Sequence, residues 1–218
     1  MCRALLLAAP FLFAPALAEA HPHIFVSTGV EVIFDDQGRA TALRISWTYD
    51  EMFSLMMVQE NGLDPDGDNV LTADELASLN GADMEWDPEF PGDTYALLGD
   101  RPLALSRPRD WTMNYDGASL TSTHVRDFDA PVPVAEVPLV VQSYDPGYYT
   151  AYTIDAEPVV TGRDGCTAGI WEPDRSKADA ILDAALKEYD GSDVESGGFP
   201  AVGAAYADEV RVTCAAPS

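Results

Sequence analysis

Positively charged residues are scarce in this sequence, which has 12 Lys and Arg against 37 Asp and Glu and a formal net charge of −25. Proteins that bind DNA, RNA or anionic lipid use Lys and Arg to neutralise phosphate groups. The charge balance therefore excludes a nucleic-acid partner and an anionic membrane surface. Acidic residues also keep a protein soluble, so the charge by itself assigns no function.

Long apolar runs are missing after the amino terminus, so the sequence predicts no membrane insertion. Residues 1–20 are typical of a cleaved signal peptide, because Arg3 precedes a short apolar stretch and Ala18-Glu19-Ala20 offers small residues for cleavage. Cleavage after Ala20 makes His21 the first residue of the mature chain, whereas cleavage after Ala18 leaves two residues ahead of it. We expect a periplasmic protein with one domain over residues 21–218.

Catalytic signatures are also absent: the chain has no Gly-x-Ser-x-Gly, no His-Glu-x-x-His and no phosphate-binding glycine loop. It has three cysteines, and Cys2 lies within the predicted signal peptide. Cys166 and Cys214 remain, and in an exported protein this pair predicts one disulfide bond. With no free thiol nucleophile and no motif, we expect that the protein is not an enzyme.

The strongest motif in the chain is the segment 64–75, DPDGDNVLTADE, which has the spacing of a single EF-hand-type calcium loop. Such a loop binds Ca²⁺ through carboxylates at positions 1, 3, 5 and 12, a backbone carbonyl at position 7 and a hydroxyl or water at position 9. The predicted calcium ligands are therefore Asp64, Asp66, Asp68, Val70, Thr72 and Glu75.

One position of this loop departs from the usual pattern. Position 6 is Asn69, where glycine is the rule, but asparagine tolerates the left-handed backbone that the turn requires. Leu71 at position 8 supplies the apolar anchor. The alternative is an acidic turn followed by a capped helix, because Thr72-x-x-Glu75 is also a capping box. A cap leaves the three alternating aspartates unexplained, so we prefer calcium.

Two of the three histidines stand together as His21-Pro22-His23. Alternate residues of an extended chain point the same way, and Pro22 favours that conformation. Imidazole binds zinc, copper, nickel and cobalt. His124 in a predicted strand would add a third nitrogen, and Asp145 a carboxylate ligand or a second-shell acceptor. The predicted site for Zn²⁺ or another transition metal consists of His21, His23, His124 and Asp145.

Each of these residues also has a simpler interpretation. An amino-terminal His-Pro-His can be a loose tail, a lone strand histidine can be structural, and aspartate before proline is a common turn residue. Three methionines could serve as soft ligands for Cu(I). At helical spacing beside Phe53 and Leu55, however, they are typical of core-filling side chains; they are Met52, Met56 and Met57.

The apolar pattern predicts an α+β fold, mainly antiparallel β and sandwich-like. A hairpin opens it, and Asp50 caps a helix to about Asn61. The calcium loop and a helix over about residues 73–80 follow, so that a helix–loop–helix is inserted at about residues 50–80. One more helix is expected over 174–189. The predicted strands are Ile24–Phe34, Ala40–Tyr49, Tyr95–Leu98, Trp111–Tyr115, Ser119–Phe128, Val134–Ser143, Tyr148–Ile154, Val159–Thr161 and Glu209–Cys214.

Several of these segments occur together in one known family. They are the start HPHIFV, the strand end WTYDE, the acidic loop, YDPGYY at residues 144–149, and Cys166 with the closing YADEVRVTC at residues 206–214. With them the chain resembles the bacterial domain-of-unknown-function family 1007, a periplasmic component of an uncharacterised transport system. Genes of that family often lie beside nickel/cobalt-type exporters or zinc-uptake genes. The resemblance implies periplasmic handling of a transition metal, and it supports His21, His23 and Asp145 as site residues.

We therefore expect a periplasmic transition-metal-binding protein, with zinc as the first candidate, that acts as a chaperone or accessory to a metal transporter. Its partners would be metal ions and a transporter component or solute-binding protein, and calcium would be structural. One alternative is a zinc-dependent hydrolase, because three ligands leave an open position that could activate water. The other is an interaction module stabilised by calcium, without a transition metal.

Overall fold

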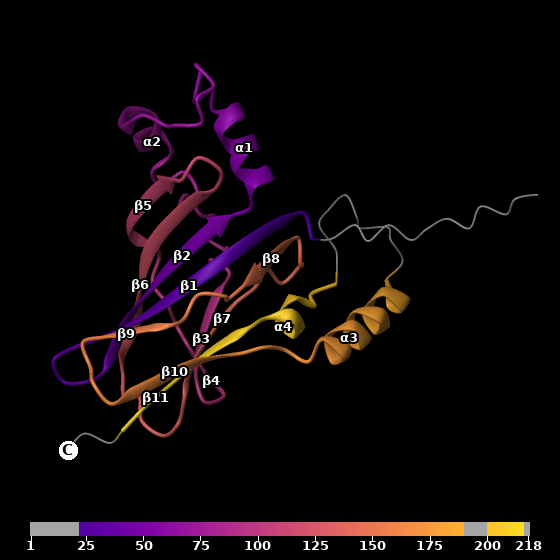
Figure 1. Ribbon diagram of the computed structural model, residues 1–218. Coiled ribbons are helices and arrows are strands. Elements are labelled where there is room, and N and C mark those ends of the chain that lie inside the picture. Colours follow the sequence, from indigo (N-terminus) through magenta and orange to yellow (C-terminus); the bar gives the residue numbers. More distant parts are fainter. Residues whose placement is uncertain (1–21, 190–199, 216–218) are drawn as a thin grey trace, which may run out of the picture.

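The computed structural model describes residues 22–189 and 200–215, which form eleven strands and four helices (Figure 1). The predicted signal peptide and His21 lie outside these residues. The strands build two sheets, and in the described residues every helix is too short or too polar to span a lipid bilayer.

The first sheet contains both halves of the predicted hairpin at its centre. Its strand order is β5-β6-β2-β1-β8, and β9 also pairs with β1. The β1–β2 and β2–β6 pairs are antiparallel, whereas β8 and β9 each run parallel to β1. The strands are β1 Ile24–Phe34, β2 Ala40–Tyr49, β5 Arg109–Tyr115, β6 Leu120–Val132, β8 Thr150–Thr153 and β9 Val159–Thr161.

The second sheet is antiparallel throughout, in the order β10-β11-β7-β3-β4. Alternate residues of both sheets point inward, and the resulting core includes Val32, Leu43 and Ile45 from the first sheet and Leu139 and Val210 from the second. The strands are β3 Thr94–Leu98, β4 Arg101–Leu103, β7 Leu139–Ser143, β10 Cys166–Trp171 and β11 Glu209–Cys214.

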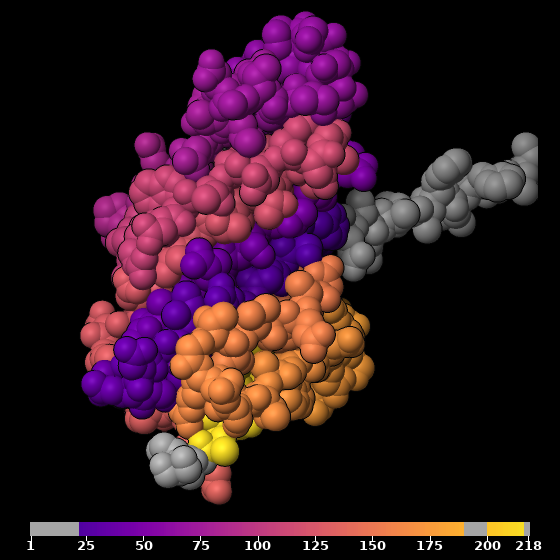
Figure 2. Space-filling view, turned by 60° about the vertical axis from the view of Figure 1, so that its left-hand side comes forward, coloured from indigo at the N-terminus to yellow at the C-terminus, as the bar shows by residue number. Residues whose placement is uncertain are grey.

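The helix–loop–helix projects from one end of the sandwich (Figure 1), and Figure 2 shows it as a separate lobe coloured purple. It consists of α1 (Glu51–Glu60), the acidic loop and α2 (Ala73–Leu79). The carboxylate of Asp50 accepts hydrogen bonds from Phe53 N at 2.8 Å and from Phe25 N at 2.9 Å, so it caps α1 and ties it to β1. A small apolar cluster, including Val58, Leu79, Met113 and Leu120, joins the lobe to β5 and β6.

The two remaining helices lie in the carboxyl-terminal part of the chain. The helix α3 (Arg175–Glu188) begins at its cap Asp174, and the short α4 is Gly203–Tyr206. They pack together through an apolar cluster of Ala178, Val202 and Tyr206. Two large apolar side chains of α3, Ile181 and Leu186, are nevertheless exposed.

The predicted fold class is confirmed, since the structure is α+β and mainly antiparallel with the helix–loop–helix after the first hairpin. The sequence analysis missed the short elements β4 and α4 and also the six-residue strand β10. The core-filling interpretation of the methionines is wrong for two of the three. Met57 packs against the small cluster, but Met52 and Met56 are exposed.

Candidate functional site

The acidic loop gathers three carboxylates. One oxygen from each of Asp64, Asp66 and Asp68 lies within 4.8 Å of the other two. Across residues 22–189 and 200–215, no other group of three His, Cys, Asp or Glu side chains comes so close together. The three side chains belong to loop positions 1, 3 and 5, where the predicted ion needs them.

The backbone of the loop brings these side chains together. Asp64, Gly67 and Asn69 all have left-handed φ angles, of 55°, 71° and 60°. The prediction that Asn69 adopts this conformation in place of glycine is therefore confirmed. The Asp64 carboxylate also accepts hydrogen bonds from Asp68 N at 3.0 Å and from Asn69 N at 3.1 Å, which closes the turn around it.

Glu75, at the last position of the loop, forms the capping box that was the alternative interpretation. Its carboxylate accepts hydrogen bonds from Thr72 N at 2.8 Å and from Thr72 Oγ1 at 2.7 Å, and Thr72 Oγ1 accepts one from Glu75 N. These hydrogen bonds lower the pKa of Glu75. The same carboxylate accepts a hydrogen bond from Asp64 N at 3.2 Å, so it reaches the start of the loop. Binding an ion through both oxygens would require it to exchange these donors for the cation.

The donors fit a hard cation, because three carboxylates converge in one turn and the remaining predicted ligands are also oxygen atoms.

The strands of the sandwich support this turn. Leu71 at position 8 packs against the small apolar cluster, as predicted. The β5–β6 turn touches the loop, since a Cβ added at Gly117 would lie 3.4 Å from the carbonyl oxygen of Asn69. Burial and the nearby carboxylates of Asp64 and Asp116 raise the pKa of Tyr115 beneath it.

The second predicted site begins where β1 begins. His23 N donates a hydrogen bond to Tyr149 O at 2.8 Å, and the two side-chain rings lie 4.8 Å apart. Tyr149 N in turn donates to the Asp145 carboxylate at 2.8 Å. The structure thus places His23 and Asp145 on either side of one residue, Tyr149, while their partner in the prediction, His21, lies outside the described residues.

Asp145 is also the turn residue of the simpler interpretation. Its two carboxylate oxygens accept hydrogen bonds from the backbone N–H groups of Gly147, Tyr149 and Thr150. These three bonds close the loop between β7 and β8. A carboxylate has about four acceptor positions, so one position remains for a cation or for an imidazole N–H.

His124 does not join this site, which corrects the predicted set of four. The strand registers align His124 with Ile45 and Ile45 with Val30. Val30 is seven residues along β1 from His23, and a strand rises by about 3.3 Å per residue. The two histidines are therefore separated by about 23 Å along the sheet. A histidine of a neighbouring strand can share a site with the amino terminus only if the strand register places it level with the start of β1. The register places His124 level with Val30 instead.

His124 is instead part of the aromatic core. Its side chain is 0% exposed, and its ring centroid lies 4.7 Å from that of Trp47 and 5.5 Å from that of Trp86. Burial, assisted by the guanidinium of Arg126, lowers the pKa of His124 to about 3. Within residues 22–189 and 200–215, neither ring nitrogen has a hydrogen-bond partner. The imidazole is thus neutral and structural.

The sequence analysis missed several other polar side chains whose atoms are buried. Asp93 is among them. One of its oxygens accepts a hydrogen bond from Tyr152 Oη at 3.0 Å, and the other has no partner in the part of the chain that the structure describes. Burial, together with the Asp145 carboxylate, raises the pKa of Asp93 to about 7 against the opposing effect of Tyr152. Among the described residues, other buried side-chain atoms without a hydrogen-bond partner belong to Thr28, Trp47, Asp83, Thr94, Ser143 and Asp208.

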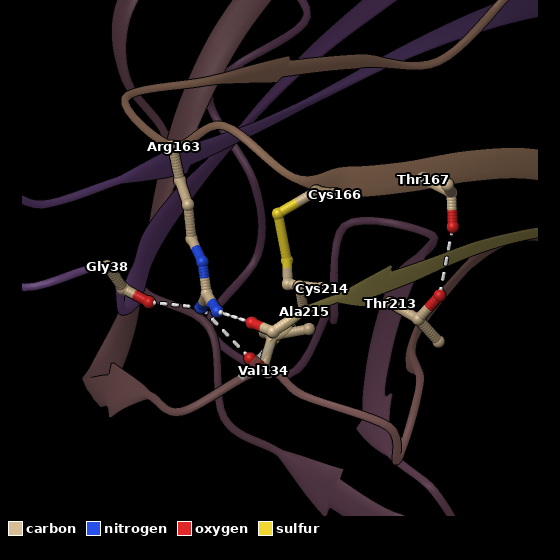
Figure 3. The surroundings of a disulfide bond; sticks show 8 residues. All are labelled: Gly38, Val134, Arg163, Cys166, Thr167, Thr213, Cys214 and Ala215. Atoms are coloured by element: carbon tan, nitrogen blue, oxygen red, sulfur yellow. Dashed lines mark hydrogen bonds between the residues drawn. A yellow bond between two sulfur atoms is a disulfide. The ribbon is translucent and has the colours of Figure 1, made fainter. Parts of the chain in front are cut away.

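The predicted disulfide between Cys166 and Cys214 is present, and it joins β10 to β11 at directly opposite positions (Figure 3). Beside it, Arg163 donates hydrogen bonds to three backbone carbonyls, those of Gly38, Val134 and Ala215. The bond and the arginine together hold the last strand against the far end of the sandwich, away from both candidate metal sites.

Comparison with protein-family models matches residues 6–214 to one family, which carries the description "Protein of unknown function (DUF1007)". The match covers nearly the whole chain and includes both the acidic loop and the turn at Asp145. None of the curated proteins compared with the chain matches it.

Proposed function

The chain belongs to the DUF1007 family, and because that family has no established function, we propose from its own residues that it is an exported metal-binding protein. Ca²⁺ binds at the acidic loop, and a transition metal, zinc first, binds at the amino-terminal histidines. The observation that carries metal binding is the convergence of the Asp64, Asp66 and Asp68 carboxylates within 4.8 Å.

Calcium has a structural role in this proposal. Asp64, Asp66, Asp68 and Glu75 supply carboxylates, Val70 a carbonyl and Thr72 a hydroxyl or a water position. The ion would offset repulsion among the carboxylates of the lobe and stiffen the connection between α1 and α2. A single loop with asparagine at position 6 suits the weak affinity of extracellular calcium modules, on the order of 10⁻⁴ to 10⁻³ M.

The transition-metal site is proposed at His21 and His23, with Asp145 as a ligand or as an acceptor from an imidazole N–H. Its support is the position of His23 beside the Asp145 turn and the rarity of histidine elsewhere in the chain. Because imidazoles bind metals in the neutral form, affinity should fall as the pH drops below about 6.5. An exposed site of few ligands suits a protein that passes its ion on, so we propose a chaperone or accessory of a metal transporter in the periplasm, without enzymatic activity.

The calcium site is tested by the melting temperature of the mature protein with calcium or with chelator. At about 10 mM free calcium, the affinity above corresponds to about 1.4–2.7 kcal/mol of stabilisation. For a chain of this size this is a shift of roughly 3–10 °C. The E75Q variant should lose most of the shift, whereas D74N, which removes the same charge from the same helix terminus but no loop ligand, should keep it. Identical melting of the wild type in the two buffers would refute calcium binding.

The transition-metal site is tested by zinc analysis after equilibrium dialysis. The wild type should hold one equivalent, and H21A/H23A should lose it while keeping the calcium shift. H124L is the matched control and should keep its zinc, because His124 lies in the core. Zinc that accompanies turnover of generic ester or phosphate substrates would favour the hydrolase alternative, and calcium without zinc would favour the interaction module.

A further inference from the structure

The helix α1 exposes apolar side chains and buries a polar one. On its outer side Met52 is 81% exposed, Leu55 48% and Met56 41%. On its inner side the buried residues are Ser54 and Val58. Its inner side also carries Met57, which packs with Val58 in the small cluster. The helix is therefore apolar on both sides, whereas a surface helix normally has its apolar stripe only toward the core.

The orientation of α1 is held by Ser54. Its hydroxyl donates a hydrogen bond to Tyr49 O at 3.3 Å and accepts one from Leu120 N at 2.9 Å, which links the helix to β2 and β6. Turning the helix to bury Met52 and Met56 would break both bonds and leave the Leu120 N–H without a partner in the interior. Met52, Leu55 and Met56 therefore stay exposed in the folded chain.

The three exposed side chains form one surface, because residues at spacings i, i+3 and i+4 lie next to one another on a helix. We call Met52, Leu55 and Met56 the methionine face. Methionine is unbranched and polarizable, and its side chain adapts to differently shaped apolar partners. Neighbouring apolar residues on one exposed helix face are typical of surfaces that another molecule covers.

The charge around this face indicates what covers it. Between Arg44 and Arg101 the chain has no lysine, arginine or histidine. Exposed Glu51 and Glu60 stand at the two ends of α1, and the carboxylates of the loop follow. These charges would repel a second copy of the chain and an anionic lipid surface, and they would attract a cationic segment.

We propose that the methionine face is the docking surface for a basic amphipathic helix of a partner protein. The apolar side of that helix covers Met52, Leu55 and Met56, and its Lys or Arg residues lie against Glu51, Glu60 and the acidic loop. Recognition of this kind uses apolar anchors at helical spacing for affinity and opposite charges for orientation. Met52, Leu55 and Met56 are not proposed metal ligands, although the acidic loop that supplies part of the surrounding charge is the proposed calcium site. Docking does not require a transition metal.

The test uses the mature protein and a synthetic 18-residue helical peptide of leucine and lysine, with leucine on one face. A peptide with glutamate in place of lysine has the same apolar face and the opposite charge. Binding is measured by isothermal titration calorimetry for the wild type and for M52Q/L55Q/M56Q. The matched control is V137Q/I181Q/L186Q, whose positions are 54%, 50% and 41% exposed but lie away from α1.

We expect one leucine–lysine peptide per chain, at least about tenfold weaker binding (1.4 kcal/mol) in the methionine-face variant, and unchanged binding in the control variant. In wild-type protein with labelled methionine methyl groups, the peptide should shift the resonances of Met52 and Met56 but not that of Met113, which is 8% exposed. Equal weakening in both variants, no binding, or equal binding of the glutamate peptide would overturn the proposal. A wild-type dimer that M52Q/L55Q/M56Q abolishes would also overturn it, in favour of a second copy of this chain.

Discussion

Replacing Asp93 by asparagine should stabilise the protein at neutral pH and leave its stability at pH 4 almost unchanged. Asp93 is 5% exposed, and its pKa is raised from 3.8 to about 7, mainly by burial. Asparagine keeps a carbonyl oxygen to accept the hydrogen bond from Tyr152 Oη. It also tolerates the left-handed backbone at this position, where φ is 44°. The substitution therefore removes the ionisation with little change in geometry.

The sign and size of the effect follow from proton linkage. Between pH 3.8 and about 7 the unfolded chain loses the Asp93 proton while the folded chain keeps it, so rising pH favours unfolding in that interval. The pKa differs by about 3 between the folded and the unfolded chain, which at 1.36 kcal/mol per pH unit corresponds to about 4 kcal/mol. Asparagine does not titrate. The free energy of unfolding of D93N should therefore be almost equal to that of the wild type at pH 4 and about 4 kcal/mol higher at pH 8.

Urea unfolding at five pH values between 4 and 8 measures this difference directly. D100N is the control, because Asp100 is exposed and its removal reports the general benefit of one charge fewer in a chain of net charge −25. The difference in the free energy of unfolding between D93N and D100N should rise as the pH increases from 4 to about 7. A constant difference, or one that rises only below pH 5, would show that Asp93 ionises normally and refute the reasoning.

Three further changes test the structure elsewhere. Replacing both Cys166 and Cys214 by alanine should lower the free energy of unfolding by about 4 kcal/mol, the chain-entropy value for a loop of this length; urea unfolding of the two proteins measures it, and an unchanged midpoint would contradict it. S54A should cost about 1–3 kcal/mol because it leaves the buried Leu120 N–H unpaired, and amide exchange at Leu120 should accelerate in the same variant. H124L should change the free energy of unfolding by less than about 1 kcal/mol, since neither ring nitrogen has a partner to lose; a loss of several kcal/mol in thermal or urea unfolding would show that the ring is bonded.

Much of the local structure follows from short segments of sequence. Asp50, Thr72 and Asp174 each cap the helix that the sequence predicts, because a side-chain oxygen needs only the next three residues to satisfy a backbone N–H. The loop 64–75 likewise contains its own turn and its own carboxylates. The Cys166–Cys214 disulfide could be predicted without geometry. Two cysteines remain once Cys2 is assigned to the predicted signal peptide, and two cysteines allow only one pairing.

Which side of a helix faces the core, and which residues of neighbouring strands lie level with each other, depend instead on contacts between residues far apart in the sequence. All three methionines of α1 look like core residues in sequence, but only Met57 packs inward. Met52 and Met56 face outward because Ser54 bonds to strands β2 and β6, 66 residues away in the case of Leu120. The predicted four-residue zinc site failed at His124 for a related reason. Alternation along β6 does not specify which residues of the neighbouring strands lie beside His124. The register of β6 with β2 places His124 far from His23 along the sheet.

The sequence by itself determined the strands of the first hairpin, the helix–loop–helix with its three converging aspartates, and the cysteine pair, because each depends on neighbours in the chain or on a choice with one outcome. Only the tertiary structure decided that His124 is a neutral core residue, that the pKa of Asp93 is raised toward neutrality, and that α1 presents Met52 and Met56 to solvent. Those properties arise from burial and from partners on other strands, and a residue's burial is set by the whole fold and not by its neighbours in sequence.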